Sequence, residues 1–339
     1  MSVYTKNGTV IMENLPSVVS FGTAVGRMEG EGPLGSCFDY VDDSPDFGES
    51  TWEKAESRLQ QLAFGQALSK GGLSESDIDF MFAGDLLNQC AASGYGMRDN
   101  GVSFFGLYGA CSTMAESLAL AAIFADNGIG QYTAAVTSSH FCSAERQFRF
   151  PENYGGQRTP TSQWTATASG CAILGAHYEA PYIKAVTVGN ITDMGIKDAN
   201  NMGAAMAPAA YATLKCHFAA AHSSPADYDL ILTGDLGYVG SELLRDLFLQ
   251  DGITLGDSYN DCGLMLFDRE KQDVHAGGSG CGCSAAVLCG HILPRMRKGE
   301  LRNVLFTATG ALMSTTLVQQ GESIPAIAHC VHITASDGR

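Results

Sequence analysis

Cys111 lies at a predicted junction between a strand and a helix. In this sequence it is the residue best placed to act as a nucleophile. It follows the apolar run 104–107 and Gly109, and it precedes an Ala-rich segment that predicts a helix over 112–127. The positive end of a helix dipole favours a thiolate, which is the nucleophile of acyl transfer. The alternative is a packing role, which we expect for the other ten cysteines. For Cys111 the position favours a functional site.

Three further titratable residues end predicted strands and are candidates to lie around a site with Cys111. Asp85 and Asp235 each follow a short apolar run in the sequence Gly-Asp-Leu, and His140 follows the strand expected over 134–137. His140 could act as a base for the cysteine. A hydrogen-bonded histidine at the end of a strand explains its position equally well, so both interpretations stay open.

Three arginines lie in a segment that is also rich in aromatic residues. Arg146, Arg149 and Arg158 flank a stretch broken by glycine and proline. Guanidinium groups pair with carboxylates through two parallel hydrogen bonds, and aromatic rings offer stacking faces. These residue types suit a flat aromatic dicarboxylate as a ligand. The alternatives are a solvated surface loop and a contact between two copies of the chain.

The elements that must position these residues repeat along the chain. Residues 77–86 are followed 150 positions later by the similar residues 227–236, and each copy suits a buried parallel strand ending in a tight turn. Ala-rich helices are predicted over 112–127 and 284–298, and a glycine follows each of them. The repeat predicts an α/β fold of two duplicated βα halves, 1–178 and 179–339.

The other expected elements fit this plan. A helix is predicted over 52–70, with a capping sequence from Ser50 to Glu53 at its start and Gly71 at its end. No linker rich in proline and serine separates the two halves, so we expect them to share one interface. The expected strands are 18–22, 80–83, 134–137, 168–174, 182–188, 230–233, 304–307 and a last strand near His332.

Composition excludes several classes of function. The net charge of −16 over 339 residues argues against nucleic-acid binding, because phosphate binding needs a basic face. No apolar run approaches the ~20 residues of a membrane-spanning helix, and the N-terminus does not resemble a signal peptide. The odd number of scattered cysteines indicates a reduced intracellular protein. We expect no cofactor and no metal site, because the cysteines and histidine within 281–291 lack the spacing of a common zinc module.

Several long segments make the chain resemble a known family. Cys111 and its Ala-rich helix resemble the active-cysteine segment of thiolases and ketoacyl-ACP synthases, whose fold has two similar halves that meet at a pseudo-dyad. The resemblance is more specific to the stage V sporulation protein AD family, which is thiolase-like. The segments that carry it are 28–35, 85–89, 138–141, 144–151, 157–164 and 201–210. It implies a thiolase-like fold layered as α/β/α/β/α.

The sequence differs from condensing enzymes at the positions of the residues that act together with the active cysteine. Such enzymes use a His and an Asn, or two His, to stabilise the developing enolate. The position of the first His is occupied here by Gly234-Asp235, and the turn 280–286 that should hold the Asn contains none. We therefore expect a non-enzymatic, degenerate thiolase-fold protein. The alternatives are a condensing enzyme that uses Cys111 with another base, and a scaffold with a vestigial cleft.

The family resemblance implies a binding function. It implies a protein that binds pyridine-2,6-dicarboxylate (dipicolinic acid), alone or with calcium, and helps to move it into the developing spore. Its partners would be the membrane-embedded SpoVA proteins and a second copy of the chain. The protein would be bound peripherally to the inner spore membrane. The ligand is expected in the cleft near Cys111, with seven candidate ligand-binding residues: Cys111, Asp85, His140, Arg146, Arg149, Arg158 and Asp235.

Overall fold

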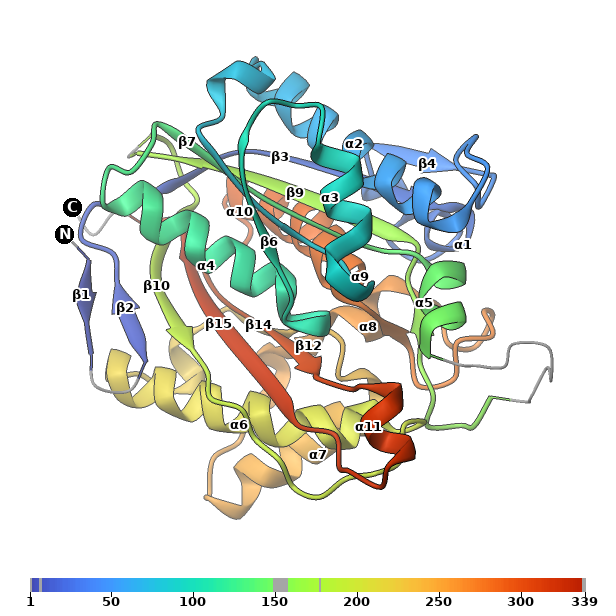
Figure 1. Cartoon of the computed structure of the whole chain (residues 1–339). Coiled ribbons are helices and arrows are strands. Elements are labelled where there is room, and N and C mark those ends of the chain that lie inside the picture. The colour runs from blue at the N-terminus through green and yellow to red at the C-terminus, as the bar shows by residue number, and fades with distance from the viewer. Residues whose placement is uncertain (1, 6–7, 149–157, 177, 337–339) are drawn as a thin grey trace.

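A computed structural model of the chain describes residues 2–5, 8–148, 158–176 and 178–336. The helices lie in three layers, above, between and below the two halves of a long sheet (Figure 1). The upper layer contains α2 (Trp52–Gly71), the middle layer α4 (Thr113–Asp126) and α9 (Cys281–Val287), and the lower layer α6 (Met202–Ala221). The predicted α/β/α/β/α fold is confirmed.

The strands of the main sheet follow one path, β12-β11-β14-β15-β10-β3-β9-β7-β5-β6. Its two halves join where Tyr182 of β10 pairs with Ser17 of β3. The strands of the first half are β3 (Ser17–Gly26), β5 (Phe80–Gly84), β6 (Ser103–Leu107), β7 (Tyr132–Ser139) and β9 (Ala168–Gly175). Those of the second half are β10 (Tyr182–Val188), β11 (Leu230–Thr233), β12 (Tyr259–Asp261), β14 (Asn303–Ala311) and β15 (Ala326–Thr334).

The duplication is visible in how the strands pair. In the first half β5 pairs in parallel with β6 and β7, and β9 pairs antiparallel with β7 and β3. In the second half β11 pairs in parallel with β12 and β14, and β15 pairs antiparallel with β14 and β10. The repeated segments predicted from the sequence thus become β5 and β11, at equivalent places in the two halves.

Short elements complete the fold. The remaining helices are α1 (Arg27–Gly30), α3 (Ala91–Met97), α5 (Phe141–Phe148), α7 (Gly237–Gln250), α8 (Cys262–Leu266), α10 (Leu293–Arg297) and α11 (Thr315–Gln319). The remaining strands are β1 (Val3–Tyr4), β2 (Thr9–Ile11), β4 (Tyr40–Asp42), β8 (Trp164–Thr165) and β13 (Gly278–Ser279). The last two, β8 and β13, pair in parallel as a separate small sheet, next to the candidate site.

The ends of two predicted helices differ from expectation. α2 extends through Gly71, the glycine expected to close it, and the left-handed C-cap is the next residue, Gly72, with φ 62°. Glycine is favoured there because it has no Cβ to clash in this conformation. The helix expected over 284–298 begins earlier, at Cys281, and a π-helical turn over Leu288–Ile292 separates α9 from α10.

Both halves contribute to one central core. Phe82 and Met114 of the first half pack in the same buried cluster as Leu232 and Phe306 of the second. Two outer clusters lie under α2 and α6. Truncating a residue of such a core typically costs 2–5 kcal/mol, so the halves support each other's folding. None of the helices in the described part of the chain is long and apolar enough to cross a membrane.

Candidate functional site

Cys111 lies in a tight turn between the edge strand β6 and helix α4 of the middle layer. A single 3-10 turn, Ala110–Ser112, joins the two elements. Ala110 has a left-handed backbone with φ 50°, which is uncommon for a residue other than glycine and occurs where a turn presents a functional side chain. The hydroxyl of Ser112 donates to the carbonyl of Gly109 at 2.7 Å and closes the turn. The predicted strand-to-helix turn is confirmed.

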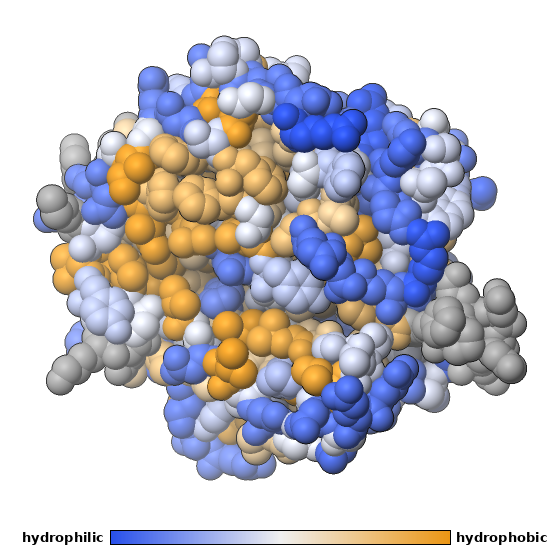
Figure 2. All heavy atoms as spheres, in the orientation of Figure 1, coloured by the Kyte–Doolittle hydropathy of each residue, from blue (hydrophilic) through white to orange (hydrophobic). Residues whose placement is uncertain are grey.

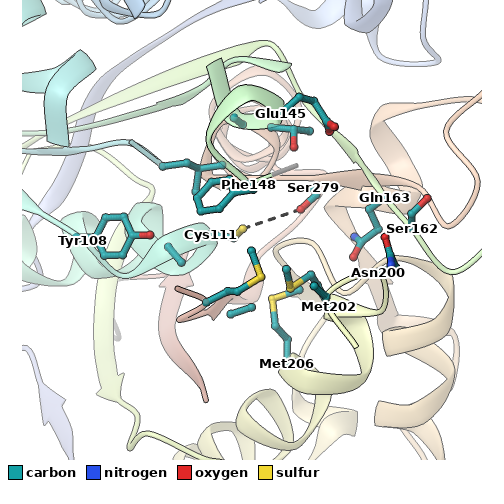
Figure 3. A pocket seen from close by; sticks show the side chains of 17 residues that line it. Tyr108, Cys111, Glu145, Phe148, Ser162, Gln163, Asn200, Met202, Met206 and Ser279 are labelled. Carbon is teal, nitrogen blue, oxygen red and sulfur yellow. Dashed lines mark hydrogen bonds between the residues drawn. The ribbon is translucent and has the colours of Figure 1, made fainter. Parts of the chain in front are cut away.

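A cavity of about 310 Å³ lies beside the Cys111 side chain, and both halves of the chain line it (Figure 3). The first half supplies the Cys111 turn and part of α5, and the second half supplies the start of α6 and the end of β14. Its apolar lining includes Leu86, Phe148, Met202, Met206 and Met313. Its polar lining includes Tyr108, Glu145, Gln163, Asn200 and Ser279. This mixture suits a small ligand with an apolar face and a polar rim.

The Cys111 side chain is a neutral thiol, contrary to the thiolate expected from its position before a helix. Burial raises the pKa of the Cys111 thiol well above its ordinary value, and the nearby carboxylate of Asp235 raises it further. The free-energy cost of burying a thiolate here therefore exceeds the stabilisation that the N-terminal end of the α4 dipole gives to it. The sulfur lies 3.9 Å from the hydroxyl oxygen of Ser279.

Asp235 follows β11 and lies behind Ser279, fully buried under the cavity. Its carboxylate accepts hydrogen bonds from the backbone amide of Gly280 at 2.8 Å and from the hydroxyls of Ser279 and Thr309, both at 3.1 Å. Burial raises the pKa of Asp235, and these hydrogen bonds oppose the shift. Asp235 thus fixes the polar wall that faces Cys111.

Asp85 follows β5 but is not among the residues that line the cavity. It accepts hydrogen bonds from the amide of Leu87 at 2.8 Å and from both the amide and the hydroxyl of Ser93, at 2.8 and 2.6 Å. Glu56 lies close by, and burial together with the Asp85 charge raises the pKa of Glu56 to about 8. Asp85 therefore holds the loop after β5 in place.

His140 also lies outside the Cys111 cavity, in a separate hollow beside Pro45. Its Nε2 donates to the carbonyl of Pro45 at 2.7 Å, and its Nδ1 accepts from the amide of Cys142 at 3.2 Å. Burial lowers the pKa of His140, so the ring is neutral, and it stacks on Trp52. Of the two interpretations of this residue, the geometry fits the hydrogen-bonded histidine at a strand end.

The predicted arginines are not part of the cavity lining in the described residues. Arg146 is half exposed and pairs with Glu53. Arg158 pairs with Asp273 at 3.1 Å and lies over the ring of Trp164, with 4.6 Å between the guanidinium carbon and the ring centroid. Arg149 lies outside the described residues.

Sequence reasoning did not identify most of the cavity lining. Gln163, Asn200, Met202 and Met206 belong to, or lie beside, segments that carry the family resemblance, which was the one signal pointing to them. Of the predicted site residues that the structure describes, Cys111 alone lines the cavity, with Asp235 directly behind the wall. Within the described residues, no group of three or more His, Cys, Asp or Glu side chains is arranged to hold a metal ion.

The fold and the turn that presents Cys111 place the protein in the thiolase-like class. OleA from Xanthomonas campestris, in a crystal structure with cerulenin, has a TM-score of 0.62 at 12% identity and covers 98% of this chain and 100% of its own. The 3-oxoacyl-[acyl-carrier-protein] synthase III of Aquifex aeolicus VF5 has a TM-score of 0.58 at 11% identity and covers 94% and 99%. At such low identity the likeness concerns the fold alone.

The chain belongs to the stage V sporulation protein AD (SpoVAD) family. The sequence model of that family matches residues 6–334. The stage V sporulation protein AD of Bacillus subtilis (strain 168) is 44% identical over 334 residues, which are 98% of this chain and 98% of the relative. The chain is therefore a sporulation protein of the sporulating cell.

Proposed function

We propose that this chain is a non-catalytic binding protein for pyridine-2,6-dicarboxylate that helps to load the compound into the developing spore. The observation that carries the proposal is the cavity beside Cys111, in a chain of a sporulation family, with a neutral thiol and a buried carboxylate at its polar wall. The cavity volume of about 310 Å³ lies at the small end of ligand sites, as a single-ring ligand requires.

The arrangement around Cys111 supports binding rather than condensation. A condensing enzyme needs donors that stabilise an enolate or an oxyanion next to its cysteine. The described residues that line this cavity include no histidine, and Ser279 donates its hydroxyl to Asp235 instead. A carboxylate behind this wall raises the energy of a neighbouring anionic intermediate.

The proposed pose places the aromatic ring of the ligand against the apolar wall and its polar groups toward Gln163 and Ser279. Phe148 offers an aromatic face, and Met202 and Met206 offer polarisable sulfurs. We propose that Arg146, Arg149 and Arg158 contribute positive charge to the binding of the dicarboxylate. Arg146 and Arg158 would have to exchange their pairs with Glu53 and Asp273 for the ligand.

Titration calorimetry tests the proposal. Purified protein is titrated with pyridine-2,6-dicarboxylate, with and without calcium, and the same ligand is then used to protect Cys111 from alkylation by iodoacetamide. We expect saturable binding and protection of Cys111 in proportion to occupancy. No saturable binding up to millimolar ligand in either condition would refute the proposal.

A second candidate function, a condensing enzyme that uses Cys111, is favoured by one observation. Ala110 has a left-handed backbone, and strained turns of this kind often present a catalytic nucleophile. This function requires that radiolabelled acetyl-CoA labels Cys111 covalently. A folded protein that takes up no label, while it still binds the dicarboxylate, decides against it.

We further propose that two copies of the chain associate through the edge strand β6. Among the strands that the structure describes, β6 pairs with β5 alone, and its residues Phe104 and Phe105 are 40% and 44% exposed. Figure 2 shows apolar side chains gathered on the face that carries β6 and α4. An exposed apolar edge strand is a template for pairing with another strand. Sedimentation of the wild-type protein should give a dimer, and Phe105→Lys a monomer.

The proposed place of action is the inner spore membrane, where SpoVA membrane proteins would hold this chain peripherally. Support for this step comes from the family alone. Fractionation of sporulating cells that do and do not produce the SpoVA membrane proteins tests it. We expect the chain in the membrane fraction only when these proteins are present.

A further inference from the structure

Gln163 forms part of the cavity wall next to Cys111 and is almost fully buried, with 8% of its surface exposed. Its side-chain nitrogen donates two hydrogen bonds, to the main-chain oxygens of Asp235 and Gly278, both at 2.7 Å. Both partners are carbonyl groups, which only accept hydrogen bonds. The amide therefore has one possible orientation, with its nitrogen toward these carbonyls.

The oxygen of the same amide has no partner. Oε1 of Gln163 is buried and makes no hydrogen bond to any described residue. Buried polar atoms are nearly always paired, and leaving one unpaired costs more than a hydrogen bond gains. Figure 3 shows the Gln163 amide at the edge of the cavity that also holds Cys111. The side chain that carries this unpaired acceptor thus lines the site of the proposed ligand.

We infer that the ligand supplies the missing donor. The cavity takes the aromatic dicarboxylate in a form that carries an O–H or N–H group, and Gln163 is the residue that selects this form. The inference deepens the proposed function and rests on it. It names the ligand chemistry that the wall of this cavity recognises.

The fully ionised dicarboxylate does not meet this requirement. With both carboxyl groups and the ring nitrogen unprotonated, it carries acceptors only, and it would set an anionic oxygen against Gln163 and near Asp235. An O–H donor arises in two ways: one carboxyl group keeps its proton, or a calcium ion held by the dicarboxylate brings a coordinated water. Both sources present the same group to the same acceptor.

The chain contains a matched control for Gln163. Gln60 is also buried, and its Oε1 also lacks a partner. Its nitrogen donates to the carbonyl of Gly84 at 3.0 Å and to the hydroxyls of Ser93 and Ser138 at 2.8 and 2.9 Å. Gln60 does not line the cavity, so its substitution removes a comparable buried amide away from the ligand.

Two probe ligands of nearly equal shape test the inference. 6-Carbamoylpyridine-2-carboxylate carries an N–H donor, and 6-acetylpyridine-2-carboxylate replaces that NH₂ group by a methyl group. At neutral pH we expect the carbamoyl compound to bind wild-type protein about 10-fold more tightly, as pairing of a buried acceptor implies. The preference should vanish in Gln163→Met and persist in Gln60→Met. Equal binding of the two probes by wild-type protein, or a preference that survives Gln163→Met, would overturn the inference.

Pyridine-2,6-dicarboxylate itself then identifies the source of the donor. Tighter binding on addition of calcium at neutral pH assigns the donor to a coordinated water, and tighter binding on acidification without calcium assigns it to a carboxyl proton. Binding that neither condition strengthens contradicts the inference but leaves the proposed function intact. Absence of saturable binding in every condition refutes the proposed function instead.

Discussion

The turn after β5 and the turn after β11 occupy equivalent places in the two halves, yet their aspartates have different partners. Asp85 accepts three hydrogen bonds, one from Leu87 of its own loop and two from Ser93 of the following helix α3. In the second half Asp261 stabilises the corresponding loop, accepting from the amides of Leu236 at 2.8 Å and Gly237 at 3.0 Å. Because Asp261 accepts from these amides, the Asp235 carboxylate accepts instead from Ser279 and Gly280 of the cavity wall.

The cysteines at the starts of α4 and α9 also differ between the two halves. Cys111 precedes α4 and faces the cavity, whereas Cys281 opens α9, is fully buried and donates its thiol to the carbonyl of Ser138 at 2.9 Å. The duplication has preserved the strand order and the buried turns of both halves. Both cysteines lie against the opposite half: Cys111 is 3.9 Å from the hydroxyl oxygen of Ser279, at the cavity, and Cys281 contacts Ser138 in the buried core.

The largest expected effect concerns the loop aspartates. Asp85→Ala leaves two backbone amides and a hydroxyl unpaired in a dry interior, so we expect a loss of about 3 kcal/mol in the free energy of unfolding. Asp235→Ala should cost only about 1 kcal/mol, because water from the cavity can reach Ser279. Urea denaturation measures both. Equal losses in the two variants would contradict the division of roles between the halves.

A second test uses the pH dependence of the first half. Burial and the Asp85 charge raise the pKa of Glu56 from 4.5 to about 8, so the folded state keeps a proton that the unfolded state releases. Stability should therefore fall as the pH rises from about 4.5 through 8. Glu56→Gln should flatten this dependence by about 2 kcal/mol in urea denaturation at several pH values. Glu31→Gln, which removes an exposed carboxyl group, is the control.

A smaller effect concerns the chemistry of Cys111. Asp235→Asn removes a negative charge that raises the pKa of the Cys111 thiol, so this pKa should fall. The rate of alkylation by iodoacetamide as a function of pH measures it, with Asp85→Asn as the matched control in the other half. An unchanged pH profile in Asp235→Asn would show that burial alone sets the thiol pKa.

The smallest expected effect lies at the ends of α2 and α6, the outer helices of the two halves. α2 ends in a left-handed glycine, Gly72, whereas α6 ends in a left-handed histidine, His222, with φ 49°. Gly72→Ala should destabilise the protein by about 1 kcal/mol, and His222→Gly should stabilise it by a few tenths to about 1 kcal/mol. Thermal unfolding of the two variants measures these opposite shifts. A loss of stability in His222→Gly would indicate a role for its side chain.

Much of the fold was readable from local pattern. The strands β10 and β11 begin and end where the apolar runs do, and α4 follows the Ala-rich segment within one residue at each end. The apolar run before Cys111 became the edge strand β6, whereas α6 was not among the expected elements. α6 contains Pro208 in its interior, a residue that ordinarily ends a helix.

The candidate site was only partly predictable. Cys111 stood out because its turn is encoded locally, by a glycine after an apolar run and before a helix-forming segment. Asp85, Asp235 and His140 all end strands as expected, but their side chains turn toward different neighbours. Gln163 carries no local signal, because a single amide side chain is common in any loop.

The sequence by itself determined the duplicated α/β plan, the turn that presents Cys111 and the membership in a sporulation family. These depend on short-range periodicity and on residue types within a few positions of each other. The tertiary structure decided the protonation state of Cys111, the separate roles of Asp85 and Asp235, and the unpaired oxygen of Gln163. Those properties depend on burial and on which residues the fold brings together. The free energy of a charged or hydrogen-bonding group changes when the surrounding residues exclude water from it.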